Sequence, residues 1–333
     1  MTDRKQIALI YGGRGLEHSV SVAGAKNLFP LFDSERYKVI PIHISRSGKA
    51  AIASPFSDGE GAKTPISFLT GGNLLTDDGE IISVDCVFPL LHGDFGEDGS
   101  VQGLFTSLRT PFVGCDARAS AVCLDKAVAK SVAESLGIPT VRWRLLTSER
   151  PCLDDFAYPV FIKPDCLGSS YGAGVARSPA EFDRLYAEAY ALSGRVLVEE
   201  FKSNARELEC AFFEAQDERV ISSAGEILCD GFYSYDKKYA RDGAKVSARA
   251  DVSREQNERI RRYSEALCSF IGIRHLARVD FFLADGEIYF NEINTMPGMT
   301  ETSLYLRLVS GEGISPTEAV NRFVSDAISA GAP

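Results

Sequence analysis

IALIYGGRGLEHSVSVAGAKNLFPLF, residues 7–32, is the stretch of the sequence that indicates the fold class. Its first seven residues form a compact apolar run that ends in two glycines, as expected for a buried strand that leads into a tight turn. Val20, Ala23, Leu28 and Phe32 then recur at a roughly helical spacing. A strand, a glycine turn and a helix in this order predict an α/β fold.

Three further apolar runs extend this pattern, at residues 37–44 (YKVIPIHI), 84–91 (VDCVFPLL) and 111–114 (PFVG). Strands that alternate with helices predict a parallel sheet of the Rossmann-like kind, with ligand-contacting groups at the carboxyl ends of the strands. Residues 45–80 are rich in Ser, Gly and Asp, and we expect them to form a long surface excursion.

The remaining sequence predicts two α+β units. The first of them combines a helix, two strands, a glycine-rich loop and a second helix, at residues 117–137, 158–164, 195–201, 168–174 and from Ser178-Pro179 onward. The second combines strands, an amphipathic helix, a hairpin and a terminal helix, at residues 206–214, 219–228, about 253–272, around Asp285-Gly286 and 316–328. We therefore expect three consecutive domains, at residues 1–118, 119–201 and 202–333.

Composition and charge exclude several classes of protein. The chain has 333 residues, 45% of them hydrophobic and 25% charged, which is typical of a globular protein large enough for a substantial core. The net charge of −10 disfavours binding to a nucleic-acid backbone or to an anionic membrane surface. We expect neither nucleic acid nor membrane as a partner.

Targeting and redox signals are also missing. The first apolar run, residues 7–11, is shorter than the core of a signal peptide, and no run approaches the ~18 to 20 residues of a membrane span. The eight cysteines form no CxxC pair and the four histidines are scattered, so the sequence signals neither a zinc site nor a redox pair. A cytoplasmic location is expected.

The hairpin at residues 278–294 carries the clearest chemical pattern. Glu292 and Asn294 lie two residues apart and share a strand face. If Ala284 lies opposite Ile288, Asp280 faces Glu292 and Arg278 faces Asn294. Oxygen ligands of this kind suit Mg²⁺, and an adjacent arginine suits a transferring phosphoryl group, whereas the alternative is a hairpin with a polar solvent face.

Lysines and loops supply further candidates, each with a structural alternative. Lys126 is expected in the middle of a helix, and Lys163 at the end of an apolar strand just before GSSYGAG (168–174), whose backbone N–H groups could approach phosphate or simply form a turn. YSYDKKY (233–239) could close over a ligand or remain a solvated loop. HGDFGEDG (92–99) follows a strand where α/β proteins bind ligands.

Eight motifs together resemble the ATP-grasp family, and within it the D-alanine–D-alanine ligases. They occur in the order of that family and span nearly the whole chain: GGRGLEHSVS, LHGDFGEDGSVQG, SAVCLDKAVAK, FIKPDCLGSSYG, VLVEEF, FYSYDKKY, RVDFF and NEINTMPGMT. The resemblance implies that ATP phosphorylates the carboxylate of one D-alanine and that the amine of a second D-alanine attacks the acyl phosphate. It also implies two Mg²⁺ or Mn²⁺ ions, a role in peptidoglycan precursor synthesis and a homodimer.

The resemblance also implies roles for individual residues. The metal ligands would be Asp280, Glu292 and Asn294. The residues at the reacting groups would be Glu17, Ser169, Tyr239, Arg278 and Gly298, and those that bind D-alanine would be His92, Ser303 and Leu304. The residues that bind ATP would be Lys126, Lys163, Ser170, Glu199, Glu200, Phe201, Glu207 and Lys238.

Some positions depart from the family pattern. Leu306 stands where a proline is common, and Tyr171 stands where a small aliphatic residue is common. KVSARADV (245–252) replaces the usual stretch after the predicted lid. This lid spans residues 233 to about 250, and we expect it to be mobile without nucleotide. None of these changes removes a metal ligand or a phosphate lysine. Two alternatives stay open: a ligase that joins D-alanine to D-lactate or D-serine, and an inactive nucleotide-binding protein.

Overall fold

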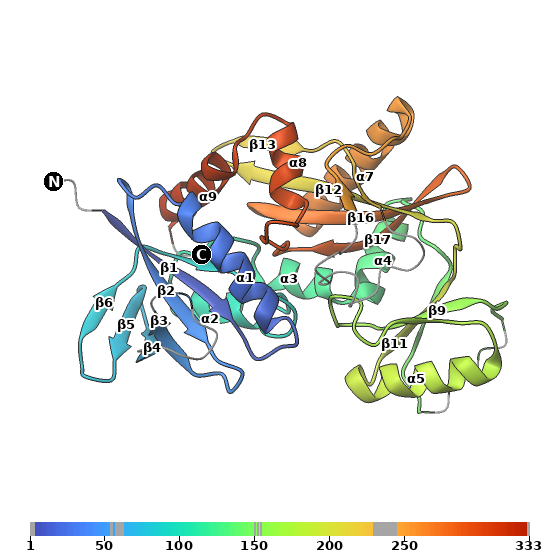
Figure 1. Ribbon diagram of the computed structural model, residues 1–333, viewed down its shortest axis with the longest axis horizontal. Helices are drawn as coiled ribbons and strands as arrows, with labels where there is room; N and C mark the ends of the chain where they lie inside the picture. The colour runs from blue at the N-terminus through green and yellow to red at the C-terminus, as the bar shows by residue number, and fades with distance from the viewer. Residues whose placement is uncertain are drawn as a thin grey trace.

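The computed structural model describes residues 4–53, 56, 63–149, 151, 153, 155–228 and 245–331. The described strands form three sheets, of seven, four and six strands. Figure 1 shows the seven-stranded sheet on the left, the six-stranded sheet at the upper right and the four-stranded sheet at the lower right. The α/β fold class is thus confirmed, while the exact domain boundaries stay a prediction.

The first sheet is mixed rather than purely parallel. Its order is β6-β5-β4-β3-β2-β1-β7, and only the pairs β1–β2 and β1–β7 are parallel. Its strands in chain order are β1 (Lys5–Gly12), β2 (Tyr37–Ile44), β3 (Ala50–Ala53), β4 (Lys63–Leu69), β5 (Asn73–Thr76), β6 (Ile81–Ser83) and β7 (Cys86–Pro89).

Two expectations for this region were wrong. Much of residues 45–80, expected as a surface excursion, forms strands β3 to β5, because short connections allow successive antiparallel pairs. The run at 111–114 makes only an isolated bridge between Val87 and Phe112.

The centre of the first sheet is covered on both faces. Helix α1 (His18–Leu28) packs on β1, and α2 (Ser100–Ser107) lies near the opposite face, where Phe105 joins the core of Ala8 and Ile10. Every residue of β1 from Ile7 to Tyr11 is buried, as expected for a strand that has parallel neighbours and two covered faces.

The expected helix at 117–137 is two helices. They are α3 (Ala117–Leu124) and α4 (Lys126–Ser135), and Asp125 between them has an extended backbone. The Asp125 carboxylate accepts from the N–H of Val128, which makes it the N-cap of α4. Lys126 therefore begins a helix instead of lying in the middle of one.

The four-stranded sheet follows, in the order β10-β9-β11-β8, and α5 (Pro179–Ser193) packs against it. Ser178 caps α5, as the Ser-Pro start predicts. The strands are β8 (Trp143–Leu146), β9 (Val160–Pro164), β10 (Gly174–Ala176) and β11 (Val196–Glu200).

The six-stranded sheet has the order β15-β14-β12-β16-β17, with β13 paired to β12. Its strands are β12 (Arg206–Ala215), β13 (Glu218–Ile221), β14 (Gly225–Leu228), β15 (Lys245–Ser247), β16 (Leu276–Ala284) and β17 (Glu287–Asn294). The associated helices are α7 (Arg254–Ile271), α8 (Tyr305–Gly311) and α9 (Pro316–Ala330).

One hydrophobic core joins the beginning of the chain to its end. Leu9 and Phe88 of the first sheet belong to the same buried cluster as Phe213 of β12, Tyr305 of α8 and Phe323 of α9. The first and last sheets are therefore held together by buried side chains, and residues from both can line one site.

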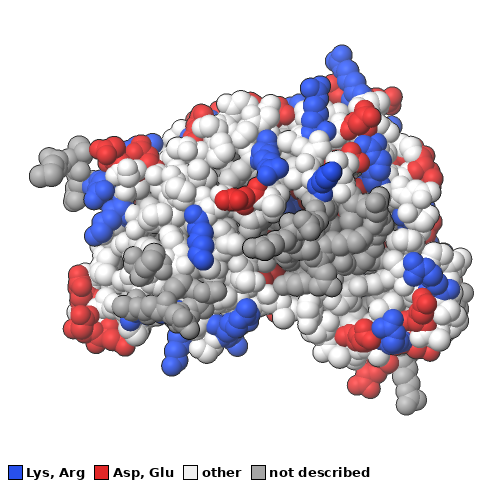
Figure 2. All heavy atoms as spheres, in the orientation of Figure 1, with Lys and Arg blue, Asp and Glu red and all other residues white. Residues whose placement is uncertain are grey.

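On the face in Figure 2, basic and acidic side chains of the described residues are interspersed.

Candidate active site

The hairpin of β16 and β17 pairs Asp280 with Glu292 and Arg278 with Asn294, as predicted. The assumed turn register was nevertheless wrong, because Ala284 lies opposite Glu287. Asp285 and Gly286 both have positive φ and form a tight two-residue turn. A β-bulge between Asp280 and Phe281 accounts for the difference, and it leaves Asn291 as the extra residue.

The cation Arg278 is held by two carboxylates. Its guanidinium donates two hydrogen bonds of 2.7 Å to Asp280 and lies 3.2 Å from an oxygen of Glu209. Burial disfavours this charge, but Asp280 and Glu209 outweigh burial and raise the pKa of Arg278 above its usual range. Glu209 was not singled out from the sequence, although its place directly across from Asp280 follows from the strand register.

The donor set fits a hard divalent cation. Asp280, Glu292 and Asn294 offer carboxylate and amide oxygens from one face of the hairpin, and the amide of Asn294 donates to Asp280 at 3.0 Å. Glu292 lies 3.4 Å from the ammonium of Lys126. Oxygen donors of this kind suit Mg²⁺ or Mn²⁺, so the residues fit the metal site that the sequence predicts.

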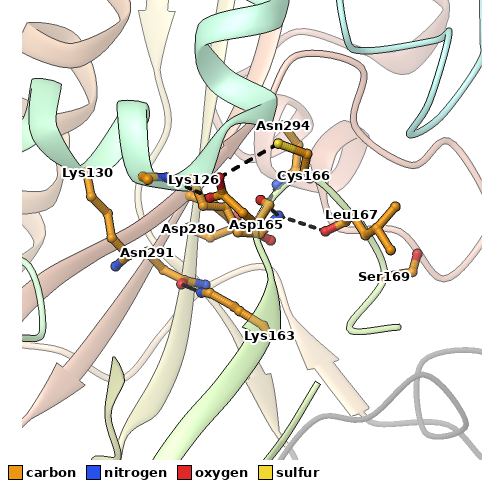
Figure 3. Close-up of polar contacts among 12 residues, drawn as sticks. Lys126, Lys130, Lys163, Asp165, Cys166, Leu167, Ser169, Asp280, Asn291 and Asn294 are labelled. Atoms are coloured by element: carbon orange, nitrogen blue, oxygen red, sulfur yellow. Dashed lines mark hydrogen bonds and ion pairs between the residues drawn. The ribbon is translucent and has the colours of Figure 1, made fainter. Parts of the chain in front are cut away.

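Lysines from two elements converge on this hairpin (Figure 3). Lys126 donates to the carbonyl of Leu167 at 2.7 Å. Lys163, at the end of β9, donates to the side-chain oxygen of Asn291 at 3.0 Å. The bulged residue therefore supplies the oxygen that positions Lys163.

Glu199 lies in a buried ion-pair network. Its carboxylate oxygens are 2.8 Å from the ammonium of Lys130 and 2.9 Å from that of Lys163. Burial opposes ionisation of Glu199, but the two lysines outweigh it and lower its pKa to about 2. Burial lowers the pKa of Lys130, and Glu199 opposes that change. Lys130 was not singled out from the sequence.

The other residues predicted at the ATP hinge differ in exposure. Glu200 pairs with Lys202 at 2.7 Å, and its side chain is 46% exposed. Glu207 lines the cleft between β9 and β16, whereas Phe201 is half-buried just after β11.

The glycine-rich loop contacts the loop between β1 and α1. Ser169 donates a hydrogen bond to the carboxylate of Glu17. A Cβ on Gly168 would lie 2.7 Å from that carboxylate, so a larger residue here would require the Glu17 side chain to move. Ser169 and Ser170 both have positive φ, and both line the cleft between β9 and β16. Ser169 and Glu17, both predicted at the reacting groups, are thus in direct contact.

His92 and Glu97 connect the loop after β7 to the turn after β17. The Nδ1 of His92 lies 3.0 Å from the carbonyl of Met296 and must carry its proton, because a carbonyl only accepts. The buried Nε2 has no hydrogen-bond partner among the described residues. Burial lowers the pKa of His92 despite the charge of Glu17, so the ring is favoured in its neutral form.

Glu97 accepts hydrogen bonds from two backbone N–H groups, those of Gly93 at 2.9 Å and Met296 at 3.1 Å. Burial and the charge of Glu17 raise its pKa to about 8. Sequence reasoning marked the loop that contains Glu97 but not this residue. Its signal was an acidic side chain between glycines at the end of a strand.

The turn after β17 contains the residues predicted for the second amino acid. Ser303 accepts from the N–H of Thr300 at 3.1 Å and lies close to Gly298, where a Cβ would be 2.9 Å from its oxygen. The side chain of Leu304 is buried in the core, so only its backbone can face a ligand.

Two cavities meet at the hairpin. The cleft between β9 and β16 has an open volume of about 700 Å³ and is also lined by the glycine-rich loop and β12. The second, of about 720 Å³, lies between the first sheet's loops and the turn after β17. The residues that line both cavities are Ser169, Glu209, Arg278 and Glu292.

Two predicted residues, Lys238 and Tyr239, lie outside the described residues. The same is true of most of the predicted lid at residues 233 to about 250. Their roles stay predictions.

A further acidic cluster lies apart from the hairpin, at Asp125, Asp165 and Cys166. Arg195 pairs with both carboxylates, at 2.8 and 2.7 Å, and so provides their counter-charge. Burial raises the pKa of Cys166 to about 11, which leaves its thiol protonated at neutral pH. This cluster is explained as a structural ion-pair network.

A cleft between two sheets that presents lysines on one wall and oxygen donors on the other defines the ATP-grasp class of enzymes. The family description "D-ala D-ala ligase N-terminus" matches residues 6–115, and "D-ala D-ala ligase C-terminus" matches residues 132–325. The chain belongs to the D-alanine–D-alanine ligase family.

Individual relatives agree with this assignment. The D-alanine–D-alanine ligase of Deinococcus radiodurans is 37% identical over 98% of this chain and 99% of its own length. The D-alanyl-alanine synthetase A of Vibrio cholerae has a TM-score of 0.88 and 28% identity over 99% of this chain and 100% of its own. A D-Ala:D-Ser ligase of Enterococcus faecalis has a TM-score of 0.86 and 31% identity over 98% and 100%.

Within the described part of the chain, every helix is too short or too polar to cross a bilayer.

Proposed function

We propose that this protein uses ATP to join two D-alanines into D-alanyl-D-alanine, a precursor of peptidoglycan. The observation that carries the proposal is the meeting of two cavities at Arg278 and Glu292. One cavity suits a nucleotide and the other suits two small amino acids, and phosphoryl transfer between them needs a shared wall.

The first step activates a carboxylate. An oxygen of the first D-alanine's carboxylate attacks the γ-phosphorus of ATP, the bond to ADP breaks, and D-alanyl phosphate forms. Lys126 and Lys163 bind the phosphates, with Lys238 as the predicted third cation. Glu17 and Ser169 orient the ammonium of this D-alanine, while the neutral His92 lies beside it.

The second step forms the peptide bond. The amine of the second D-alanine attacks the acyl carbon, the bond to phosphate breaks, and the amine loses its proton. Arg278 and the N–H of Gly298 stabilise the negative oxygen of the tetrahedral intermediate. Ser303 and the backbone of Leu304 bind the second carboxylate.

Asp280, Glu292 and Asn294 would hold two Mg²⁺ or Mn²⁺ ions. When bound, these ions neutralise charge on the phosphates. The arrangement of this chain supports the role because Arg278 can keep Glu209 as a partner when the oxygens of Asp280 turn to a cation. We also propose a cytoplasmic homodimer, which sedimentation of the purified protein tests.

The decisive experiment measures ADP release and identifies the product. D-Alanine with ATP and Mg²⁺ should release ADP and yield the dipeptide, while L-alanine, as the control, should not. D-Serine and D-lactate are then added in competition, because a D-Ala:D-Ser ligase is among the similar structures. A mixed product as the main species would replace the proposal with that alternative. An absence of ADP release with every substrate would favour an inactive nucleotide-binding protein.

A further inference from the structure

Lys130 is a completely buried cation behind the cleft between β9 and β16. Its side chain is 0% exposed, its ammonium lies 2.8 Å from Glu199, and it donates to the carbonyl of Phe290 at 3.4 Å. It lies one helical turn after Lys126 on α4, and both lysines point toward the strands of the hairpin (Figure 3). A buried lysine needs a specific partner, and here the partner is shared.

The carboxylate of Glu199 is divided between two lysines. One oxygen faces Lys130 and the other faces Lys163, which also donates to Asn291. Lys163 lines the cleft, whereas Lys130 and Glu199 are not among its lining residues. The three charged groups sum to one net positive charge, and the member that faces the cleft is Lys163.

We propose that Lys130 is a positioning residue that keeps the positive charge of Lys163 available to the phosphates of a nucleotide. It does so by sharing the negative charge of Glu199 from the side away from the cleft. The proposal rests on the function proposed above, because it takes the cleft between β9 and β16 as the nucleotide site.

Removal of Lys130 changes the charge at the cleft without leaving a buried charge alone. Glu199 would still have Lys163 as a partner, so the carboxylate stays compensated. Lys163 and Glu199 would then form a neutral pair, and the lysine would be drawn toward Glu199 instead of the phosphates. Nucleotide affinity should fall more than D-alanine affinity does.

The test compares Lys130→Met with Lys130→Arg, which keeps a positive charge beside Glu199. Equilibrium binding of a fluorescent ATP analogue is the main measurement, since it does not require turnover. Lys130→Met should weaken binding by about 10- to 100-fold, the factor expected for a lost charge-assisted contact. Lys130→Arg keeps the cation that shares the charge of Glu199 and should retain most of the affinity. Lys5→Met, which removes a surface lysine that pairs with Asp85, is the control.

Steady-state kinetics supply the second readout. Lys130→Met should raise the KM for ATP and leave the KM for D-alanine within about twofold, whereas a general structural defect would change both. The proposal is overturned if Lys130→Met binds the analogue like the wild type, or if Lys130→Arg binds as weakly as Lys130→Met. Should Lys130→Met fail to fold, Lys130→Gln takes its place in both comparisons, because it removes the charge and keeps a donor for Glu199 and the carbonyl of Phe290.

The failure of the proposed function has a separate signature. Wild-type protein that binds the ATP analogue but releases no ADP with D-alanine refutes the ligase function alone. Equal binding of the analogue by wild type and Lys130→Met refutes the role of Lys130 alone.

Discussion

Replacement of Glu97 by glutamine should make the stability of the protein less dependent on pH. Glu97 is buried, and its pKa rises from 4.5 to about 8 through burial and the nearby charge of Glu17. Between these two pH values the folded state binds a proton that the unfolded state has released. Stability therefore falls as pH rises through this window.

The size of the effect follows from the pKa change. Each pKa unit corresponds to about 1.4 kcal/mol, so a rise from about pH 6 to about pH 7.5 should cost the wild type roughly 2 kcal/mol through this group. Glutamine cannot ionise and has the shape of the protonated acid. Its NH2 group cannot accept a backbone N–H as the second carboxyl oxygen does, so the substitution adds a loss of stability that is the same at every pH. The free energy of unfolding of Glu97→Gln should lack the pH-dependent contribution.

Urea unfolding at several pH values measures it. We expect the free energy of unfolding of the variant to gain roughly 2 kcal/mol on that of the wild type between about pH 6 and about pH 7.5, on top of a constant offset from the lost acceptor. Curves that stay parallel over this range would show that Glu97 is already ionised, and that its two N–H donors, from Gly93 and Met296, outweigh burial.

Three further changes test other parts of the structure. Glu292→Gln should lower ADP release by about 100-fold or more, a loss typical of one electrostatic contact at a reacting phosphate. The melting temperature should change little, because this side chain is partly exposed. Equal loss of stability and activity would contradict the metal-site assignment. Gly12→Ala should destabilise the fold by more than about 1 kcal/mol in thermal unfolding, because φ is +95° and the new Cβ would lie 2.3 Å from the carbonyl oxygen of Ile44; an unchanged melting temperature would refute this. Tyr305→Phe should cost about 1 to 2 kcal/mol in urea unfolding through its lost hydrogen bond to the carbonyl of Phe212, and a neutral result would mean that the carbonyl finds another donor.

Local patterns in the sequence predicted local elements well. Ser178-Pro179 predicted the start of α5, and Ser253 and Gly272 delimit α7 as the amphipathic pattern indicated. Such signals act within one helical turn and need no knowledge of the rest of the chain.

The errors came from features that depend on more distant contacts. Asp125 interrupts a continuous helical pattern because it caps the next helix, and its pairing with Arg195, just before β11, is invisible in the local sequence. The antiparallel strands between 50 and 83 lack strong alternation and are stabilised by neighbours in the sheet.

The candidate site was predicted to a similar degree. Motif resemblance supplied residues that the structure brings together, such as Glu17 with Ser169 and Asp280 with Glu292. It did not reveal Lys130, Glu97 or Glu209, because each of these acts through burial and through a partner on another element.

Because Asn291 is a bulged residue, it adds to the length of β17 without changing which neighbouring residues pair across the hairpin. If Asn291 were deleted, Phe281 would still face Phe290 and Asp280 would still face Glu292, since the extra residue lies between these two pairs. The deletion would remove only the side chain that accepts from Lys163. A related chain that is one residue shorter here can therefore keep the carboxylate pair, and such chains should be matched at Glu292 instead of by counting from the turn.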